Sequence, residues 1–506
     1  MSTPPPPLQV IPPLLDPTLT FDGRPGERTA DLNTAFWQRL CAPGAVLAHA
    51  VRLDSPQAEE GAAGAGPDRG TACLLALAAA DTLGEPAGSA AHLLGLAAAA
   101  RVRGAGDAGL TVAVDDVHLV TGTTQSSADV ARAAALSTLM LPEVEAGAAL
   151  LRAAGPGVRV ILHADQQLPA VLGILGRAPA CAPVLTGAFV RDHAAALRRV
   201  PALAGARLLP EAPELPGARI GGLVPAGRDA SRGAVWVTEP DSVPAAGPWA
   251  GWLDAAGAAG LGPGRRERCA GLVVTVARLD GWGRAWDAAG GPYDLRHAAV
   301  LGRRVPVALD LLAGAPGVTY EDLDRAVALA AGSGVRIAGC RPFRLAAGHP
   351  GGAWAGVPVH TAAEPGHDLA RWAASATAPD TAAGPWLDRL ARRHPLFPGR
   401  LAAALFAADG HPADGGTSWN PAVRQVRTRH AAPPGTAPGD FLVDLRTGRM
   451  NRLSVPLAAL TTALRRGGPA ASGALRRLPG PRRAALLAAL RTAGALLPDG
   501  RPTDAA

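Results

Sequence analysis

The chain has 506 residues, of which 48% are hydrophobic and 18% are charged. This length and apolar content exclude wholesale disorder and predict about three domains with packed cores. The net charge of +7 rests on arginine, since the sequence contains no lysine, and the arginines are scattered with little aromatic interleaving. We therefore expect no nucleic-acid partner.

The first hundred residues predict an irregular start followed by helices. Residues 1–30 are rich in proline and turn residues, which is typical of an irregular lead-in without a signal peptide. Residues 31–40 place apolar side chains at helical spacing, residues 52–71 predict a loop, and residues 73–103 predict one or two alanine-rich helices. No apolar run reaches the length of a membrane span, so we expect a cytoplasmic protein without membrane contact.

From about residue 110 the pattern changes to alternating strands and helices. The predicted strands are 111–114, 136–141, 158–162 and 184–186, and the predicted helices are 142–154, 168–175 and 190–200. This order is typical of a parallel sheet with helices on its faces. We therefore predict a Rossmann-like domain over residues 31–225.

A second series of strands and helices follows a segment rich in glycine and proline. The predicted strands are 234–238, 272–277, 305–312 and 335–338, and the predicted helices are 249–259 and 319–331. Thr319 and Asp322 have the spacing of a capping box at the start of the last helix. Successive βα units favour a partial (β/α) barrel of the TIM type over residues 230–410.

The C-terminal part has a different pattern. Residues 441–453 predict two short strands joined at Thr447 and Gly448, and residues 455–465 predict a helix. We expect residues 415–506 to form a small winged-helix-like or strand-plus-helix module. The fold class predicted for the whole chain is therefore α/β: a Rossmann-like parallel-sheet domain, a partial barrel and this module.

Short stretches of the chain resemble the cobalamin-binding radical-SAM family. They are Asp31-Leu32-Asn33 with Phe36-Trp37, residues 136–164, residues 235–261, residues 305–330, and residues 341–344 with Gly348. The resemblance implies a cobalamin domain followed by a barrel that holds S-adenosylmethionine and a [4Fe-4S] cluster. It also implies a role in natural-product biosynthesis, with a peptide as substrate, because such proteins pair a barrel with a small C-terminal module.

The sequence departs from this family at the cluster site. The family binds its cluster through CxxxCxxC, because three thiolates hold three of the four irons. Here the five cysteines are Cys41, Cys73, Cys181, Cys269 and Cys340, and no two of them are close enough to form a CxxC motif. We therefore expect no [4Fe-4S] cluster. The spacing of His349, His360 and His367 matches no common metal motif, so we predict no metal site either.

Candidate cofactor-binding residues follow from the resemblance and from strand ends. They are Ser137, Leu139, His163, Gly314 and Gly317. His163 ends an aliphatic strand, where α/β sheets place groups that face a ligand. The glycines would let an anionic ligand approach a helix N-terminus. His118 is a weaker candidate for a cobalt ligand, because its spacing to Gly122 departs from the family motif.

Candidate catalytic residues lie at the carboxyl ends of the barrel-like strands, where such folds carry their chemistry. They are Glu239, Asp241, Asp310 and Arg341. Ordinary solvated loop residues are the alternative interpretation for all four.

Two functions from different classes fit this sequence. One is a radical-SAM-like protein without its own cluster, which acts as a binding or accessory protein for a peptide substrate or a partner biosynthetic enzyme. The other is an active cobalamin-dependent or other barrel enzyme, such as a methyltransferase. The missing cluster motif favours the first, and the charged strand ends favour the second.

Overall fold

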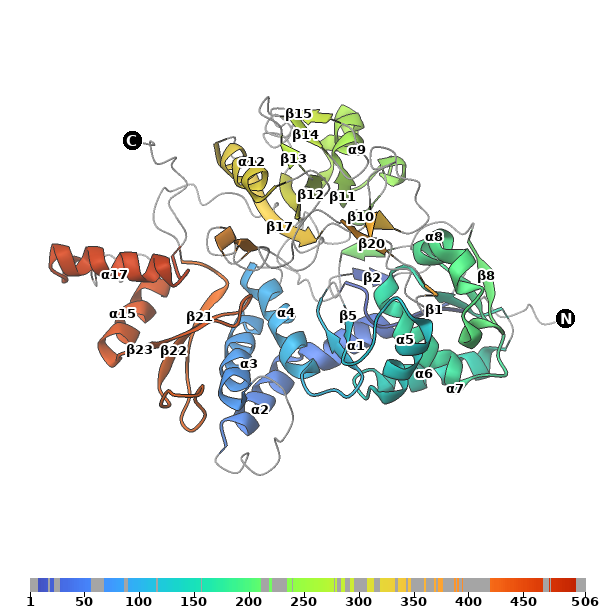
Figure 1. Cartoon of the computed structure of the whole chain (residues 1–506), viewed down its shortest axis with the longest axis horizontal. Coiled ribbons are helices and arrows are strands. Elements are labelled where there is room, and N and C mark those ends of the chain that lie inside the picture. The colour runs from blue at the N-terminus through green and yellow to red at the C-terminus, as the bar shows by residue number, and fades with distance from the viewer. Residues whose placement is uncertain are drawn as a thin grey trace.

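The computed structural model describes most of the chain outside several loops. The described residues are 8–16, 19–21, 28–55, 68–85, 90–114, 117–155, 157–210, 218–220, 234–238, 240–276, 278–279, 284–286, 292–294, 307–313, 319–332, 335–342, 345–346, 359–360, 368–369, 372–375, 386–387, 389–390, 394, 419–466, 473 and 475–496. They form two sheets with their helices and a C-terminal module (Figure 1).

The first sheet, here sheet A, has five parallel strands in the order β3-β1-β6-β7-β8. Their bounds are β1 Leu8–Ile11, β3 Arg28–Asp31, β6 Arg159–Ile161, β7 Val184–Thr186 and β8 Arg207–Leu209. Numbered along the chain, this order is 2-1-3-4-5, one of the two common doubly wound orders. The predicted parallel α/β sheet is therefore confirmed.

The predicted irregular lead-in is wrong. Residues 1–30 contain β1, an interior strand of sheet A, and also β2 (Leu19–Phe21), which pairs with β9 (Ala218–Ile220) in the second sheet. Val10 and Ile11 are fully buried. The strand escaped prediction because prolines flank a run of four residues, too short to show a period.

Eight described helices lie in the connections between β3 and β8 of sheet A, and among them α2, α3 and α4 pack on one another and on α1. They are α1 Leu32–Cys41, α2 Pro43–Leu53, α3 Arg69–Leu83, α4 Ala90–Gly104, α5 Ser127–Leu136, α6 Leu141–Ala154, α7 Leu168–Arg177 and α8 Ala188–Leu197. Right-handed crossovers place these connections on a single face, because each runs in the same direction across the sheet. Among the described helices none is by itself long and apolar enough to cross a membrane, and the one pair that passes together, α5 with α6, is bent by 106°.

The strand predicted at 136–141 is wrong. The segment contains the end of α5 and the start of α6, and Pro142 occupies the first turn of α6, where proline is tolerated. The segment is apolar and short, so periodicity could not separate a strand from a helix end. The strand predicted at 111–114 is present as β4 (Leu110–Val112), but it pairs antiparallel with β5 (Val117–Leu119) in a separate hairpin and does not join the parallel sheet.

The second sheet, here sheet B, has the strand order β17-β16-β12-β11-β10-β9-β2. Its remaining strands are β10 Val235–Val237, β11 Trp249–Asp254, β12 Cys269–Val276, β16 Val307–Ala313 and β17 Arg336–Pro342. These five are parallel and neighbours in chain order, while β9 and β2 join antiparallel. The described strands of this sheet form an open arrangement.

The predicted helix at 249–259 is a strand in its first half. β11 ends at Asp254 and the short helix α9 covers Ala255–Gly260. Trp249 and Leu253 are buried against the helices on one face of sheet B, so the segment follows a strand period in the structure. The predicted helix at 319–331 is confirmed as α12 (Tyr320–Gly332). Its capping box is confirmed as well: the Asp322 carboxylate accepts from the Thr319 N–H at 2.9 Å, and the Thr319 hydroxyl accepts from the Asp322 N–H at 3.1 Å.

The two faces of sheet B have different neighbours. On one face, Leu253, Val274 and Leu309 pack against α9 and α12. On the other face, small residues such as Ala250, Val273 and Ala308 belong to the same apolar core as the interior of sheet A. Shorter described elements complete this part: α10 Pro263–Arg266, the antiparallel strands β13 Arg278–Leu279, β14 Arg284–Trp286 and β15 Pro292–Asp294, and the antiparallel strands β18 Leu345–Ala346, β19 Val359–His360 and β20 Trp372–Ser375.

The C-terminal module is a three-stranded antiparallel sheet followed by helices. Its elements are β21 Val423–Arg427, β22 Asp440–Asp444, β23 Met450–Leu453, α15 Val455–Arg466 and α17 Gly480–Thr492. The two predicted strands and the first helix are confirmed, and β21 was missed. One sheet face packs on α15 and α17 through Leu442, and the other packs on the first part of the chain through Phe441.

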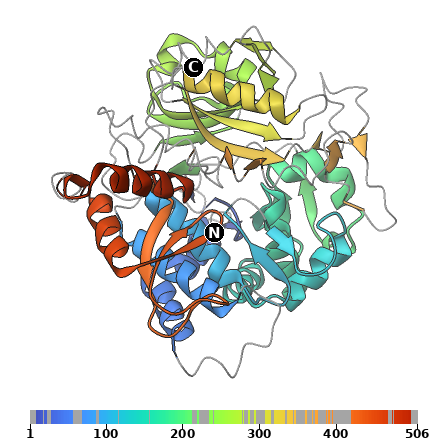
Figure 2. The same ribbon diagram turned by 60° about the vertical axis from the view of Figure 1, so that its left-hand side comes forward.

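The module lies beside α3, as both ribbon views show (Figure 2). At one end, the Asp54 carboxylate accepts hydrogen bonds from the backbone N–H groups of His430 and Ala431, each at 2.8 Å. At the other end, Arg465 pairs with Asp81 at 2.9 Å. Near the first anchor Gly70 has no room for a side chain, because a Cβ would lie 2.0 Å from the carbonyl oxygen of Ala432. The module is therefore fitted to α3 along its length.

Asp54 makes this docking sensitive to acid. Burial acts to raise the pKa of Asp54, but the N–H groups of Ala431, Arg429 and His430 outweigh it and hold the pKa below its ordinary value. The group therefore stabilises the docked module above the unfolded-state pKa, and this contribution is lost as the pH falls through the lower folded-state value.

We expect Asp54→Asn to speed amide hydrogen exchange at residues 429–431 by about tenfold at neutral pH, because it removes charge-assisted bonds worth about 1.5 kcal/mol after allowance for partial exposure. Exchange followed by mass spectrometry measures this, with Arg52→Gln on the exposed side of α2 as the control. The difference should vanish in acid, where the wild-type carboxyl is also neutral. Equal protection in both proteins at neutral pH would contradict the role of Asp54.

Candidate functional site

The carboxyl edge of sheet A contains the point where the strand order reverses, between β1 and β6. Open α/β sheets place ligands at such a point. The predicted ligand residue His163 lies here, directly after β6 and its flanking Leu162. The backbone N–H of His163 donates to the Gln167 side chain at 2.8 Å, and the Gln167 amide donates to the Pro12 carbonyl at 3.0 Å. Gln167 is fully buried and ties the loops after β1 and β6 together.

A second buried amide ties the loop after β1 to α1. The Asn33 side chain accepts from the Leu15 N–H at 2.8 Å and from the Trp37 ring N–H at 3.1 Å. The Trp37 N–H also reaches the Leu15 carbonyl at 2.6 Å. Leu14, buried between them, has a φ of 77°, a backbone conformation that costs a leucine free energy. The polar groups on this side of the switch point are therefore occupied by the protein itself.

Ser137 and Leu139, predicted to bind a cofactor, lie elsewhere. They form the junction of α5 and α6, where the Asp107 carboxylate accepts from the N–H groups of Thr138 at 2.9 Å and Leu139 at 3.1 Å. Burial would raise the pKa of Asp107, but these and neighbouring donors hold it below its ordinary value. Their position is that of a structural turn. His118 is exposed on β5, away from the strands of sheet A.

Asp310 stands out among the predicted catalytic residues. It lies within β16, is 1% exposed, and belongs to the face of sheet B that α9 and α12 leave uncovered. The Thr275 hydroxyl lies 3.4 Å from its carboxylate and accepts a hydrogen bond from the Trp252 ring N–H. Across the sheet, a Cβ at Gly339 would lie 2.3 Å from an Asp310 oxygen. Glycine at this position therefore gives the carboxylate its space.

Of the other predicted catalytic and cofactor residues at the strand ends of sheet B, the structure describes Asp241 and the backbone of Arg341. Asp241 is exposed in the short 3-10 helix Pro240–Ser242. Arg341 pairs through its backbone with Leu312 at the end of β17. Glu239, Gly314 and Gly317 lie outside the described residues, as do His349 and His367.

Trp252 and Thr275 were missed because sequence patterns gave no reason to place them near Asp310. Residues 249–259 were predicted to be helical, so Trp252 had no strand neighbours. Thr275 lies inside an aliphatic strand, where a single hydroxyl is usually an incidental core residue. A strand assignment for 249–254 would have revealed both, because parallel neighbours in register share a face.

The cysteines show the character of inert core groups. Burial raises the pKa of the Cys41, Cys73 and Cys269 thiols to about 12 in each case. A thiolate is the form that binds metal, so these three would bind poorly. Among the described residues no group of three or more histidine, cysteine or acidic side chains is placed to hold a metal ion.

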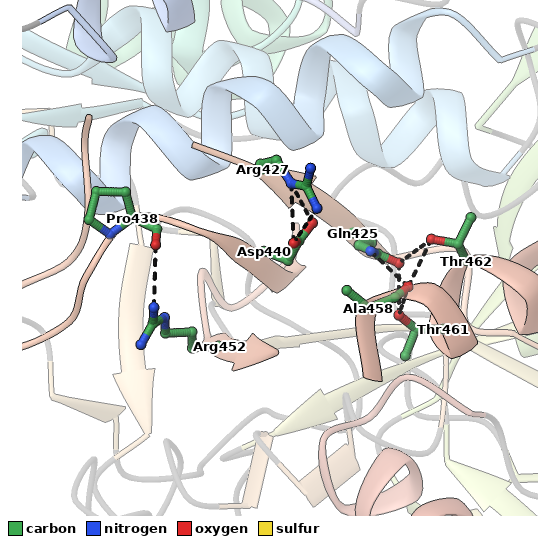
Figure 3. Close-up of polar contacts among 8 residues, drawn as sticks. All are labelled: Gln425, Arg427, Pro438, Asp440, Arg452, Ala458, Thr461 and Thr462. Carbon is green, nitrogen blue, oxygen red and sulfur yellow. Dashed lines mark hydrogen bonds and ion pairs between the residues drawn. The ribbon is translucent and has the colours of Figure 1, made fainter. Parts of the chain in front are cut away.

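The C-terminal module provides a different kind of site: an uncovered sheet edge. In the described part of the chain, β23 ends its sheet and no strand pairs with its outer side. One face of this sheet is covered by α15, which is bound to β21 through Gln425; this side chain donates to the Ala458 carbonyl at 3.0 Å and accepts from the Thr461 hydroxyl at 2.7 Å (Figure 3). An unpaired edge is a template for another strand.

The hydrogen-bond pattern shows which groups face outward. The Asp444 N–H donates to the Arg449 carbonyl at 2.9 Å, so this pair is hydrogen-bonded across β22 and β23. Pairs alternate along an antiparallel ladder. The register Val443 with Met450 and Phe441 with Arg452 therefore makes these the pairs without cross-strand bonds. Met450 and Arg452 direct their backbone N–H and carbonyl groups to the free edge.

The module is also strongly basic. Residues 419–496 contain 13 arginines and 2 aspartates, a net charge of 13 − 2 = +11, whereas the whole chain carries +7. Both aspartates are paired within the module: Asp440 with Arg427 at 2.7 Å and Asp444 with Arg446 at 3.0 Å. Most of the arginine charge therefore acts on whatever approaches the module.

No family model matches the chain, and comparisons with curated proteins and solved structures give no match. The resemblance to cobalamin-binding radical-SAM proteins therefore stays an expectation that rests on short sequence patterns. The function has to be argued from the side chains themselves.

We expect Asn33→Ala to lower the free energy of unfolding by about 1–3 kcal/mol, because it leaves the buried Leu15 N–H without an acceptor. Urea unfolding followed by tryptophan fluorescence measures this. Gln38→Ala on the exposed side of the same helix should change stability by less than about 0.5 kcal/mol. An Asn33 variant as stable as the Gln38 variant would contradict the proposed tie.

We expect Thr275→Val to lower stability by about 1–3 kcal/mol, because the shape is kept while the Trp252 N–H loses its acceptor in a buried place. Thermal unfolding measures this, with Thr111→Val at an exposed strand position as the matched control. An unchanged stability at position 275 would mean that the Thr275 hydroxyl does not stabilise the arrangement of Trp252 and Asp310.

Proposed function

We propose that this chain is a peptide-binding accessory protein, built on a radical-SAM-like scaffold without its own cluster and acting in the maturation of a peptide natural product. The observation that carries the proposal is the free edge of β23 in a module with 13 arginines and 2 aspartates. An extended peptide adds to such an edge through main-chain hydrogen bonds. The positive charge selects an acidic peptide.

The scaffold part of the proposal rests on topology. A doubly wound sheet A followed by five parallel strands in chain order agrees with a Rossmann-like domain before part of a (β/α) barrel. The three strands and two helices of the last module support a strand-plus-helix unit, for which winged-helix-like remains the finer proposal. The absence of CxxxCxxC from the sequence supports a role without radical chemistry.

The cofactors implied by the resemblance enter this proposal unequally. Cobalamin does not fit the switch point of sheet A as it stands, because Gln167 and Asn33 already bind the loop backbone there and His118 lies on a hairpin that is not part of this sheet. Binding of S-adenosylmethionine at Gly314 and Gly317 stays a proposal from the sequence, since both residues lie outside the described part of the chain. The peptide-binding function requires neither group.

A second candidate is a barrel enzyme, and Asp310 favours it. A carboxylate beside a threonine hydroxyl, on a sheet face without helices, is a suitable group for orienting or deprotonating a small substrate. Its nearly complete burial argues for the structural alternative. We therefore rank this function below peptide binding.

The proposal is tested with fluorescein-labelled peptides of about 15 residues that differ in net charge. We expect the full-length protein to bind acidic peptides, and binding to weaken as salt rises from about 50 to about 300 mM, because the charges are exposed. Fluorescence anisotropy measures both. Failure of every acidic peptide to bind would sink the proposal.

A pair of variants at one position separates backbone from charge. Arg452→Gln removes the charge and keeps the outward N–H, so we expect a loss of up to about fivefold in affinity. Arg452→Pro also removes that N–H, and we expect a further loss of about tenfold or more. Proline is tolerated on an edge strand, so the fold should persist, which circular dichroism checks. Equal binding by the two variants would exclude strand addition at β23.

A further inference from the structure

The free edge of β23 has two chemically different sides. Side chains alternate along a strand, so Met450 and Arg452 lie on one side, and Asn451 and Leu453 on the other. The first side is shared with Phe441 and Val443, which pack toward α3. The second is shared with Leu442, which packs toward α15 and α17. A strand added to this edge would present its own side chains alternately to these two sides.

The side toward the module helices is apolar. Leu453 is buried in one cluster with Leu490 of α17, and the half-buried Leu486 and Leu487 pack against the same cluster. At the start of α15, directly beyond the strand, Val455 is 75% exposed, the largest exposure among the large hydrophobic residues described. The buried Leu453 and the exposed Val455, which directly follows the strand, offer apolar contact to a bound side chain at this edge.

The side toward α3 carries a positive charge. Arg452 is exposed, and its guanidinium donates to the Pro438 carbonyl at 3.3 Å (Figure 3). Gly439 lies beside it, and a Cβ there would be 3.6 Å from the Arg452 Nε. Within the described residues no acidic side chain pairs with Arg452. The carbonyl leaves the cation uncompensated, so a carboxylate on a facing strand would be favoured.

Resting on the proposed peptide-binding function, we propose that the bound segment alternates acidic and apolar residues and lies antiparallel to β23. Its acidic residues face Arg452, and its apolar residues face Leu453 and Val455 at the start of α15. The antiparallel direction continues the existing ladder, in which Met450 and Arg452 each offer one donor and one acceptor to the new strand. The site therefore selects a peptide in which acidic and apolar residues alternate, and a peptide with the same net charge in another order binds less well.

The test uses two labelled peptides of identical composition and charge. One alternates, Glu-Leu-Glu-Val-Glu-Leu-Glu, and the other places the four glutamates before the three apolar residues. We expect the full-length protein to bind the alternating peptide at least about tenfold more tightly, because in the block order about half of the side chains meet the wrong side in either phase. Arg452→Glu should reverse the charge preference, losing the glutamate peptide and gaining a peptide with lysine at the same places.

The outcomes separate this inference from the function on which it rests. Equal binding of both peptides, with Arg452→Pro abolishing both, would overturn the alternation and keep strand addition at β23. Absence of binding by either peptide would overturn the peptide-binding function itself. A preference for the alternating peptide that Arg452→Glu fails to change would place the acidic residues elsewhere and overturn the assignment of the two sides. Circular dichroism and the elution volume of Arg452→Glu confirm that the variant is folded.

Discussion

The loop between β1 and β2 connects the two sheets, and the rest of the structure depends on how its conformation is fixed. β1 is an interior strand of sheet A, and β2, a few residues later, is an edge strand of sheet B. Between them the chain passes through Leu14 at a positive φ, fixed by the side chains of Asn33 and Trp37. Backbone strain of this kind persists when the surroundings determine the conformation. These buried hydrogen bonds therefore couple the positions of the two sheets.

The same hydrogen bonds reduce the capacity of the switch point in sheet A to bind a ligand. In an open α/β sheet this edge usually offers unpaired backbone groups to a ligand. Here Gln167 bonds to the loops after both β1 and β6, and Asn33 bonds to the first of them. Loop backbone groups that are already hydrogen-bonded gain little by binding a polar molecule, because each new bond replaces an existing one. These side chains make the loops at this edge a structural joint.

The C-terminal module provides the surface on which the proposed function rests. Its sheet packs on α3 with one face and on α15 and α17 with the other, and Gln425 fastens α15 over β21. At the edge of this sheet, Met450 and Arg452 of β23 direct their backbone groups outward. Asp54 and the pairing of Arg465 with Asp81 hold the module in this position, so the edge is presented by a fixed support rather than by a loose domain.

The sequence by itself determined the features that depend on neighbours along the chain. Helix α12 was predicted with its capping box, because Thr319 and Asp322 act within one turn, and β22, β23 and their turn followed from Thr447 and Gly448. Asp310 was identified because it ends an aliphatic run. The tertiary structure alone decided the pairing of β1 with β6, the row that joins Trp252 and Thr275 to Asp310, and the free edge of β23. These depend on contacts between residues far apart in sequence, whose partners no local period reveals.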